Sequence, residues 1–166
     1  RDDDIGELSD NLAKLIDLFA GYRLPLNLEV IPGLLTPQCR DFLKKKCGRT
    51  KLLEVHQHGF LHKNHGPSMT EKSEYGAQRT GRVVLKELSE GKKILRKAFG
   101  ASFFEAFSPP WNRMHEAHIG SLKARGFKVL SRSSDEGRGV IFYNKGIYEI
   151  NVTLDIIEWK KREFIG

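Results

Sequence analysis

The chain has 166 residues, of which 39% are hydrophobic and 30% are charged. This length fits a single domain over residues 1–166, and the apolar content is high enough for a hydrophobic core, which excludes a disordered chain. The net charge of +7 favours anionic partners in general, but the lysines and arginines form short, separated runs typical of solvated surfaces, so we expect no nucleic-acid partner.

The termini and the cysteines bear on the cellular setting. No apolar stretch approaches the roughly 20 residues that a membrane-spanning helix needs, so we expect no membrane partner. The chain opens on Arg1 without an initiator Met or a secretory signal, and we expect it to be incomplete at both ends. Two cysteines, Cys39 and Cys47, do not make a disulfide framework, and together these features favour a cytoplasmic location. The sequence leaves the oligomeric state open.

The apolar pattern predicts strands and helices that alternate along the chain. We expect helices over residues 8–21, 36–48, 83–99 and 113–125, and strands over residues 26–30, 52–55, 103–107 and 127–130. Two further strands, residues 140–143 and 147–155, flank a hairpin turn at residues 144–146. Residues 63–81 read as a long polar loop, and loops of this length are often functional. The alternation predicts an α/β fold of parallel βα units, in an open sheet or a barrel.

Unusual residues follow the predicted strands. In both architectures the active site lies at the carboxyl ends of the strands. Those positions are residues 2–4, 32–33, 56–65, 108–112 and 131–132. We therefore expect these segments to come together at the carboxyl ends of the strands, around one active site.

Histidines and aspartates in these segments indicate a metal site. Four of the six histidines lie between His56 and His65, and His58 and His62 are spaced so that one turn can direct both at a single ion. A carboxylate usually completes such a site, and the run Asp2-Asp3-Asp4 can supply one. We expect a divalent metal, with zinc favoured over cobalt, nickel or manganese. The alternatives are surface histidines and a solvated acidic end or helix cap.

The order of these motifs resembles the polysaccharide deacetylase family, the NodB-homology group of carbohydrate esterases (family 4). An aspartate pair comes first, His-x-x-x-His follows a later strand, and a Pro-Pro-aromatic sequence follows a further one, so the resemblance covers residues 2 to about 130. It implies a distorted (β/α) barrel and a metal-dependent hydrolase that removes acetyl groups from an acetylated carbohydrate, acting on carbon–nitrogen bonds.

The first two motifs carry over as follows. The resemblance makes Asp2 the general base and Asp3 a metal ligand, although a shift of register to Asp3 and Asp4 fits as well. In the second motif His58 and His62 match the metal ligands, whereas the small hydroxyl residue of the family is replaced by Gly59.

The later motifs match less well. The aromatic wall is present as Trp111, whose backbone N–H the resemblance assigns to the oxyanion. The arginine that orients the base is replaced by Ser108, and Arg113 can stand in only if its loop folds back. No histidine follows His118 to act as general acid, and Asp155 lies roughly where such a group would be. We expect the substrate to lie near a larger set of residues: Asp4, His65, Pro110, Asn112, Arg113 and Asp155.

The sequence leaves two other functional hypotheses open. His56-x-His58 after a strand also resembles the paired histidines of barrel metallohydrolases of the amidohydrolase class, but those carry the pair on the first strand. The departures from the deacetylase motifs are also compatible with a basic barrel that binds a glycan and no longer turns it over.

Overall fold

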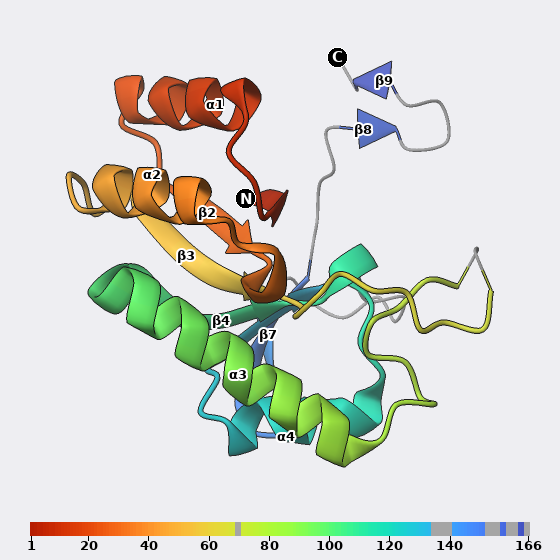
Figure 1. The fold of residues 1–166 in the computed structure, drawn as a ribbon. Helices are drawn as coiled ribbons and strands as arrows, with labels where there is room; N and C mark the ends of the chain where they lie inside the picture. Colours follow the sequence, from red (N-terminus) through yellow and green to blue (C-terminus); the bar gives the residue numbers. More distant parts are fainter. Residues whose placement is uncertain (69–70, 134–140, 152–156, 159–162, 165–166) are drawn as a thin grey trace.

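The computed structural model describes residues 1–68, 71–133, 141–151, 157–158 and 163–164 (Figure 1). Its helices are α1 (Asp10–Gly21), α2 (Pro37–Cys47), α3 (Gly81–Phe99) and α4 (Ile119–Ala124), with short 3₁₀ turns at Pro32–Leu34, Gly100–Ser102, Pro110–Asn112 and Glu116–His118. The strands are β1 (Asp2–Ile5), β2 (Leu26–Val30), β3 (Leu53–His58), β4 (Phe103–Ser108), β5 (Val129–Arg132), β6 (Ile141–Asn144) and β7 (Ile147–Asn151), and a separate pair, β8 (Ile157–Glu158) and β9 (Glu163–Phe164).

Seven strands form one sheet in the order β1-β2-β3-β4-β5-β7-β6. The strands from β1 to β5 and β7 are parallel, and only β6 runs antiparallel, through the hairpin to β7. The parallel α/β fold expected from the sequence is therefore confirmed. Among the described strands the sheet stays open, since β1 and β6 are its edges and do not pair with each other.

The helix ends follow local capping chemistry. Ser9 Oγ accepts a hydrogen bond from the Leu12 N–H at the start of α1, and Thr36 Oγ1 does the same for the Cys39 N–H at the start of α2. Helix α3 ends at Phe99, and the next residue, Gly100, has a φ of 56°, which suits a residue without a Cβ. The residue types at these positions therefore explain where the helices begin and end.

The core lies between the sheet and the helices that cover it (Figure 1). Alternate residues of β2, such as Leu26, Leu28 and Val30, face this layer and are almost completely buried. The fully buried large side chains of the helices and of the loop that follows β3 complete it: Ile16, Leu43, Tyr75, Leu88, Leu95, Ile119 and Leu122. Burial of this kind stabilises the fold by about 1.5–3 kcal/mol per large side chain.

One predicted helix is shorter than expected. In place of a helix over residues 113–125, the chain forms a 3₁₀ turn and the six-residue helix α4. The backbone before it bonds elsewhere, because the His115 N–H donates to the Tyr75 carbonyl at 2.9 Å and the Met114 carbonyl accepts from Arg132 at 2.7 Å. These tertiary bonds take the groups that a helix would use.

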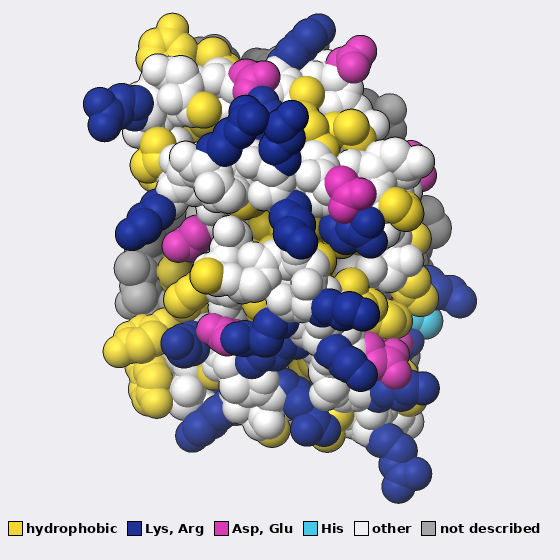
Figure 2. Space-filling view, turned by 60° about the vertical axis from the view of Figure 1, so that its left-hand side comes forward, with side chains coloured by type: hydrophobic (Ala, Val, Ile, Leu, Met, Phe, Trp, Pro, Cys, Tyr) yellow, Lys and Arg dark blue, Asp and Glu magenta, His cyan; other side chains and the backbone are white. Residues whose placement is uncertain are grey.

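The positive charge is dispersed over the surface. Figure 2 shows Lys and Arg side chains scattered across one face, with acidic and apolar side chains between them. The described residues of this face therefore form no single cationic patch. No helix in the described part of the chain is long and apolar enough to cross a membrane.

Candidate active site

Asp4, His58 and His62 come together at the carboxyl ends of β1 and β3. Asp4 Oδ1 lies 3.1 Å from His58 Nε2 and 2.9 Å from His62 Nε2, and the three side-chain ligand atoms lie within 4.8 Å of one another. Ligands of a tetrahedral zinc ion, each at about 2.0–2.1 Å, lie about 3.3–3.4 Å apart, so the spacing of these atoms is close to what a divalent ion needs. One carboxylate and two imidazoles leave a position open for water or substrate.

The backbone explains how adjacent aspartates reach one site. Successive side chains of a regular strand point to opposite faces. Asp4 has a φ of 64°, and the pairing of β1 with β2 is irregular between Asp2 and Ile5. With this break in the strand, Asp3 contacts Arg1 while Asp4 contacts the two histidines.

The structure changes the register of the aspartate motif. Asp4 rather than Asp3 lies against the two histidines, so Asp4 is the carboxylate that could hold a metal ion together with them. In this register Asp3 takes the position that the resemblance gives to the base, and Asp2 lies one residue further back in β1. This is the shifted register that the sequence left open.

Asp3 is held by Arg1, which the sequence analysis did not predict to belong to the site. Arg1 Nε and Nη2 each lie 3.0 Å from an oxygen of Asp3, one on Oδ1 and the other on Oδ2. The same guanidinium donates to Ser108 Oγ at 3.1 Å, to Ser131 Oγ at 2.8 Å and to Asn112 Oδ1. Arg1 thus fills the space beside Ser108, where the resembled motif carries its arginine. Arg1 is a near neighbour of Asp3 in the chain, but its contacts with Ser108, Asn112 and Ser131 join segments far apart in sequence, and the sequence carries no signal for them.

The pKa values of the two aspartates shift in opposite directions. Hydrogen bonds from His58 and His62 hold the pKa of Asp4 well below its usual range, so Asp4 is ionised, as a ligand must be. Burial raises the pKa of Asp3, although Arg1 opposes this change. A carboxylate with a raised pKa beside an ionised ligand suits a general base.

Trp111 forms the wall of the site. Its ring centroid lies 4.4 Å from that of His62, with the planes tilted by 52°. Trp111 and Asn112 both have a φ of 56°, and His62 has a φ of 54°. Left-handed backbone at non-glycine residues is costly and clusters at functional sites, so the strain supports this location.

The remaining predicted residues differ in how close they lie to Asp4, His58 and His62, the triad of the site. Pro110 is buried against Gly59, and Asn112 accepts from Arg1. His65 contacts Arg79 instead of the triad, and the Arg113 side chain is exposed while its carbonyl accepts from Ser73 Oγ. Arg1 therefore takes the place proposed for Arg113. The prediction for Asp155 lies outside the described residues.

Two histidines outside the triad are bonded within the fold. His56 Nδ1 lies 3.0 Å from Glu29 Oε1, and its Nε2 lies 3.3 Å from Glu54. His118 Nε2 lies 3.0 Å from the Gly76 carbonyl. The alternative hypothesis of an amidohydrolase-type site with a His56–His58 pair is therefore not supported, because His56 is bonded to carboxylates away from the triad.

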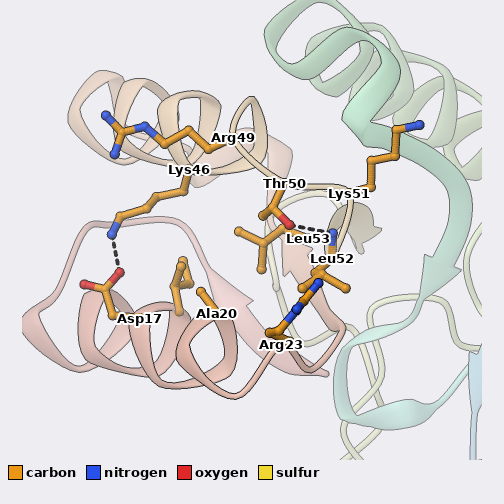
Figure 3. A pocket seen from close by; sticks show the side chains of 10 residues that line it. Asp17, Ala20, Arg23, Lys46, Arg49, Thr50, Lys51, Leu52 and Leu53 are labelled. Carbon is orange, nitrogen blue, oxygen red and sulfur yellow. Dashed lines mark hydrogen bonds and ion pairs between the residues drawn. The ribbon is translucent and has the colours of Figure 1, made fainter.

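A basic pocket of about 710 Å³ lies elsewhere on the molecule, between α1, α2 and the start of β3 (Figure 3). Arg23, Lys46, Arg49 and Lys51 line it, with Asp17 paired to Lys46. It lies toward the amino ends of β2 and β3, and none of its lining residues belongs to the triad.

Comparison with solved structures identifies the architecture. A protein described as a polysaccharide deacetylase from Mycobacterium smegmatis superposes with a TM-score of 0.66 at 19% identity, over 89% of this chain and 47% of its own. The deacetylase PplD of Streptococcus pyogenes, in complex with acetate, gives 0.62 at 16% identity, over 82% of this chain and 55% of its own. The chain has the polysaccharide deacetylase fold.

Another structure with this fold holds a metal. A family 4 acetyl xylan esterase from Clostridium thermocellum, in complex with a cobalt ion, gives a TM-score of 0.54 at 12% identity, over 76% of this chain and 54% of its own. No family model and no curated protein sequence matches the chain. The chain spans about half the length of the structures that share the polysaccharide deacetylase fold.

Proposed function

We propose that the protein is a divalent-metal-dependent hydrolase that removes acetyl groups from an acetylated carbohydrate, with the carbon–nitrogen bond of an N-acetyl sugar as the target. One observation carries the proposal: the Asp4–His58–His62 set lies beside Asp3 and Trp111, at the strand ends of a polysaccharide deacetylase fold. Zinc suits two imidazoles and a carboxylate, and cobalt, nickel and manganese are the alternatives.

The residues of the site divide the chemistry between them. When bound, the divalent ion lowers the pKa of water and polarises the acetyl carbonyl. Asp3 accepts the proton of the attacking water at a carboxylate oxygen, and Arg1 holds that carboxylate by two contacts. The backbone N–H of Trp111 donates to the developing oxyanion, and the indole ring of Trp111 stacks on the sugar. For protonation of the leaving atom, Asp155 remains the candidate from the sequence.

The proposal is tested by metal analysis and an acetate assay. We expect about one transition-metal ion per chain in the parent protein, and loss of that ion in His58→Ala and in His62→Ala. The loaded parent should release acetate from chito-oligosaccharides. Asp3→Asn should keep the metal and lower kcat by about 10²–10⁴-fold, as loss of a general base does.

Two results would contradict the proposal. A parent protein that takes up no zinc or cobalt on reconstitution has no metal centre. A loaded protein that binds chito-oligosaccharides without releasing acetate is a glycan-binding protein instead.

A further inference from the structure

A buried carboxylate lies beneath the loop that carries His62. Glu74 belongs to the long irregular segment after β3, yet its side chain is only 1% exposed. Its Oε1 accepts from the Leu61 N–H at 2.8 Å, and its Oε2 accepts from the Phe60 N–H at 3.1 Å. Burial raises the pKa of Glu74, while the backbone N–H groups of Leu61, Phe60 and Lys63 oppose that rise. These amides offset the cost of burying the carboxylate.

Gly59 makes room for this carboxylate. A Cβ at position 59 would lie 2.0 Å from Glu74 Oε2 and 2.7 Å from two ring carbons of Pro110. Gly59 also has a φ of 56°, which a residue without a side chain adopts at low cost. Gly59 is the position where the sequence departs from the resembled motif, and the space of the missing side chain is occupied by Glu74.

The segment around Glu74 is fixed on both sides. The Ser73 carbonyl accepts from the His65 N–H at 2.8 Å, on the histidine loop. On the other side, Ser73 Oγ donates to the Arg113 carbonyl at 3.2 Å, and the Tyr75 carbonyl accepts from the His115 N–H at 2.9 Å. Glu74 is therefore supported by the chain that follows Trp111, and one buried segment connects the two loops of the site.

We propose that Glu74 is a positioning residue that holds the loop of residues 59–63 so that His62 Nε2 meets Asp4 and the ring of Trp111. Glu74 touches none of the metal-ligand atoms and acts through the backbone of the loop. A carboxylate suits this place because both of its oxygens accept. A Gln side chain would turn one amide donor toward a backbone N–H. The part of this inference that concerns the metal rests on the proposed function, whereas the part that concerns the loop does not.

The test compares Glu74→Gln with Glu71→Gln in the otherwise unchanged chain. Glu71 is three residues away on the same segment and is exposed, so its variant removes the same charge without touching the loop. Two measurements are made: Co²⁺ affinity with the visible spectrum of the bound ion, and hydrogen exchange of the Phe60 and Leu61 amides without metal. Glu74→Asp, which keeps the charge on a shorter side chain, is the second variant, and circular dichroism checks its fold.

We expect Glu74→Gln to weaken Co²⁺ binding by about 10–100-fold, as changes to groups that orient ligands do, to alter the visible spectrum, and to speed exchange at both amides. Glu71→Gln should match the parent, and Glu74→Asp should retain part of the affinity. Parent-like exchange in both Glu74 variants would overturn the proposal, as would parent-like affinity and spectrum in Glu74→Gln. If the parent binds no Co²⁺, the proposed function fails, and the exchange of the two amides decides the role of Glu74 by itself.

Discussion

At the scale of single residues, the site depends on which aspartate meets which partner. Asp3 and Asp4 are neighbours in the chain, but one contacts Arg1 and the other contacts two histidines. The left-handed backbone at Asp4 produces this division. The guanidinium of Arg1 also reaches Ser131 on β5, so it links Asp3 to the far side of the site.

Replacement of Arg1 by Lys tests its hold on Asp3. A lysine ammonium cannot make the two-point contact of a guanidinium, so Asp3 would lose its orientation. We expect kcat for acetate release to fall by up to about 100-fold, since small misplacements of reacting groups cost that much. Metal content should stay at the parent value, because Arg1 contacts none of the three ligand side chains. Arg40→Lys, at the exposed Arg40–Asp41 pair, is the control and should change neither quantity.

At the scale of elements, the ends of β1, β3 and β4 bring the loops of the site together. The close approach of the Gly59 backbone to Pro110 joins the loop after β3 to the loop after β4. The same contact leaves no room for a larger residue at position 59. Packing between these loops therefore determines where His62 and Trp111 meet.

Gly59→Ala measures how tightly the loops are packed. The new methyl group would collide with Glu74 and Pro110, and the backbone would be strained at its positive φ. We expect the free energy of unfolding in urea to fall by about 1–3 kcal/mol. Gly21→Ala, at the end of α1 with no atom within 4 Å of the new group, should leave stability unchanged or raise it. Equal stability of the Gly59→Ala variant and the parent would show that the loops separate easily.

At the scale of the whole molecule, α2 contributes two thiols, together with Leu43, to the hydrophobic core. Cys39 and Cys47 are both free and buried, with exposed fractions of 0% and 5%. Burial raises the pKa of each thiol from its ordinary value of 9.0 to about 11. Both thiols therefore stay protonated in the folded protein over a pH range in which they ionise in the unfolded chain.

This difference predicts a loss of stability in alkali. Because the folded pKa lies above the unfolded value, the contribution of each thiol is complete below pH 9 and falls as the pH rises toward 11. We expect the urea midpoint to drop more steeply over this range in the parent than in the Cys39→Ala/Cys47→Ala variant. A thiol reagent at pH 8 should label the folded chain far more slowly than the unfolded chain. Rapid labelling of the folded protein would contradict the burial.

Local chemistry in the sequence determined most of the elements and the residue types of the site. Ser9, Thr36 and Gly100 mark helix ends because capping acts over one or two turns, and alternating apolar residues mark the strands. The spacing of His58 and His62 predicted from local geometry alone that both imidazoles can face a single metal ion. The parallel order of strands and helices placed these residues at one edge of the sheet.

Only the tertiary structure decided which groups meet across long separations in the chain. The backbone break at Asp4 sets the aspartate register, and Arg1 meets Ser108 through the pairing of strands far apart in sequence. Glu74 reaches the histidine loop from an irregular segment, where side-chain periodicity gives no direction. Such contacts depend on packing and on tertiary hydrogen bonds, which also shortened the predicted helix over residues 113–125.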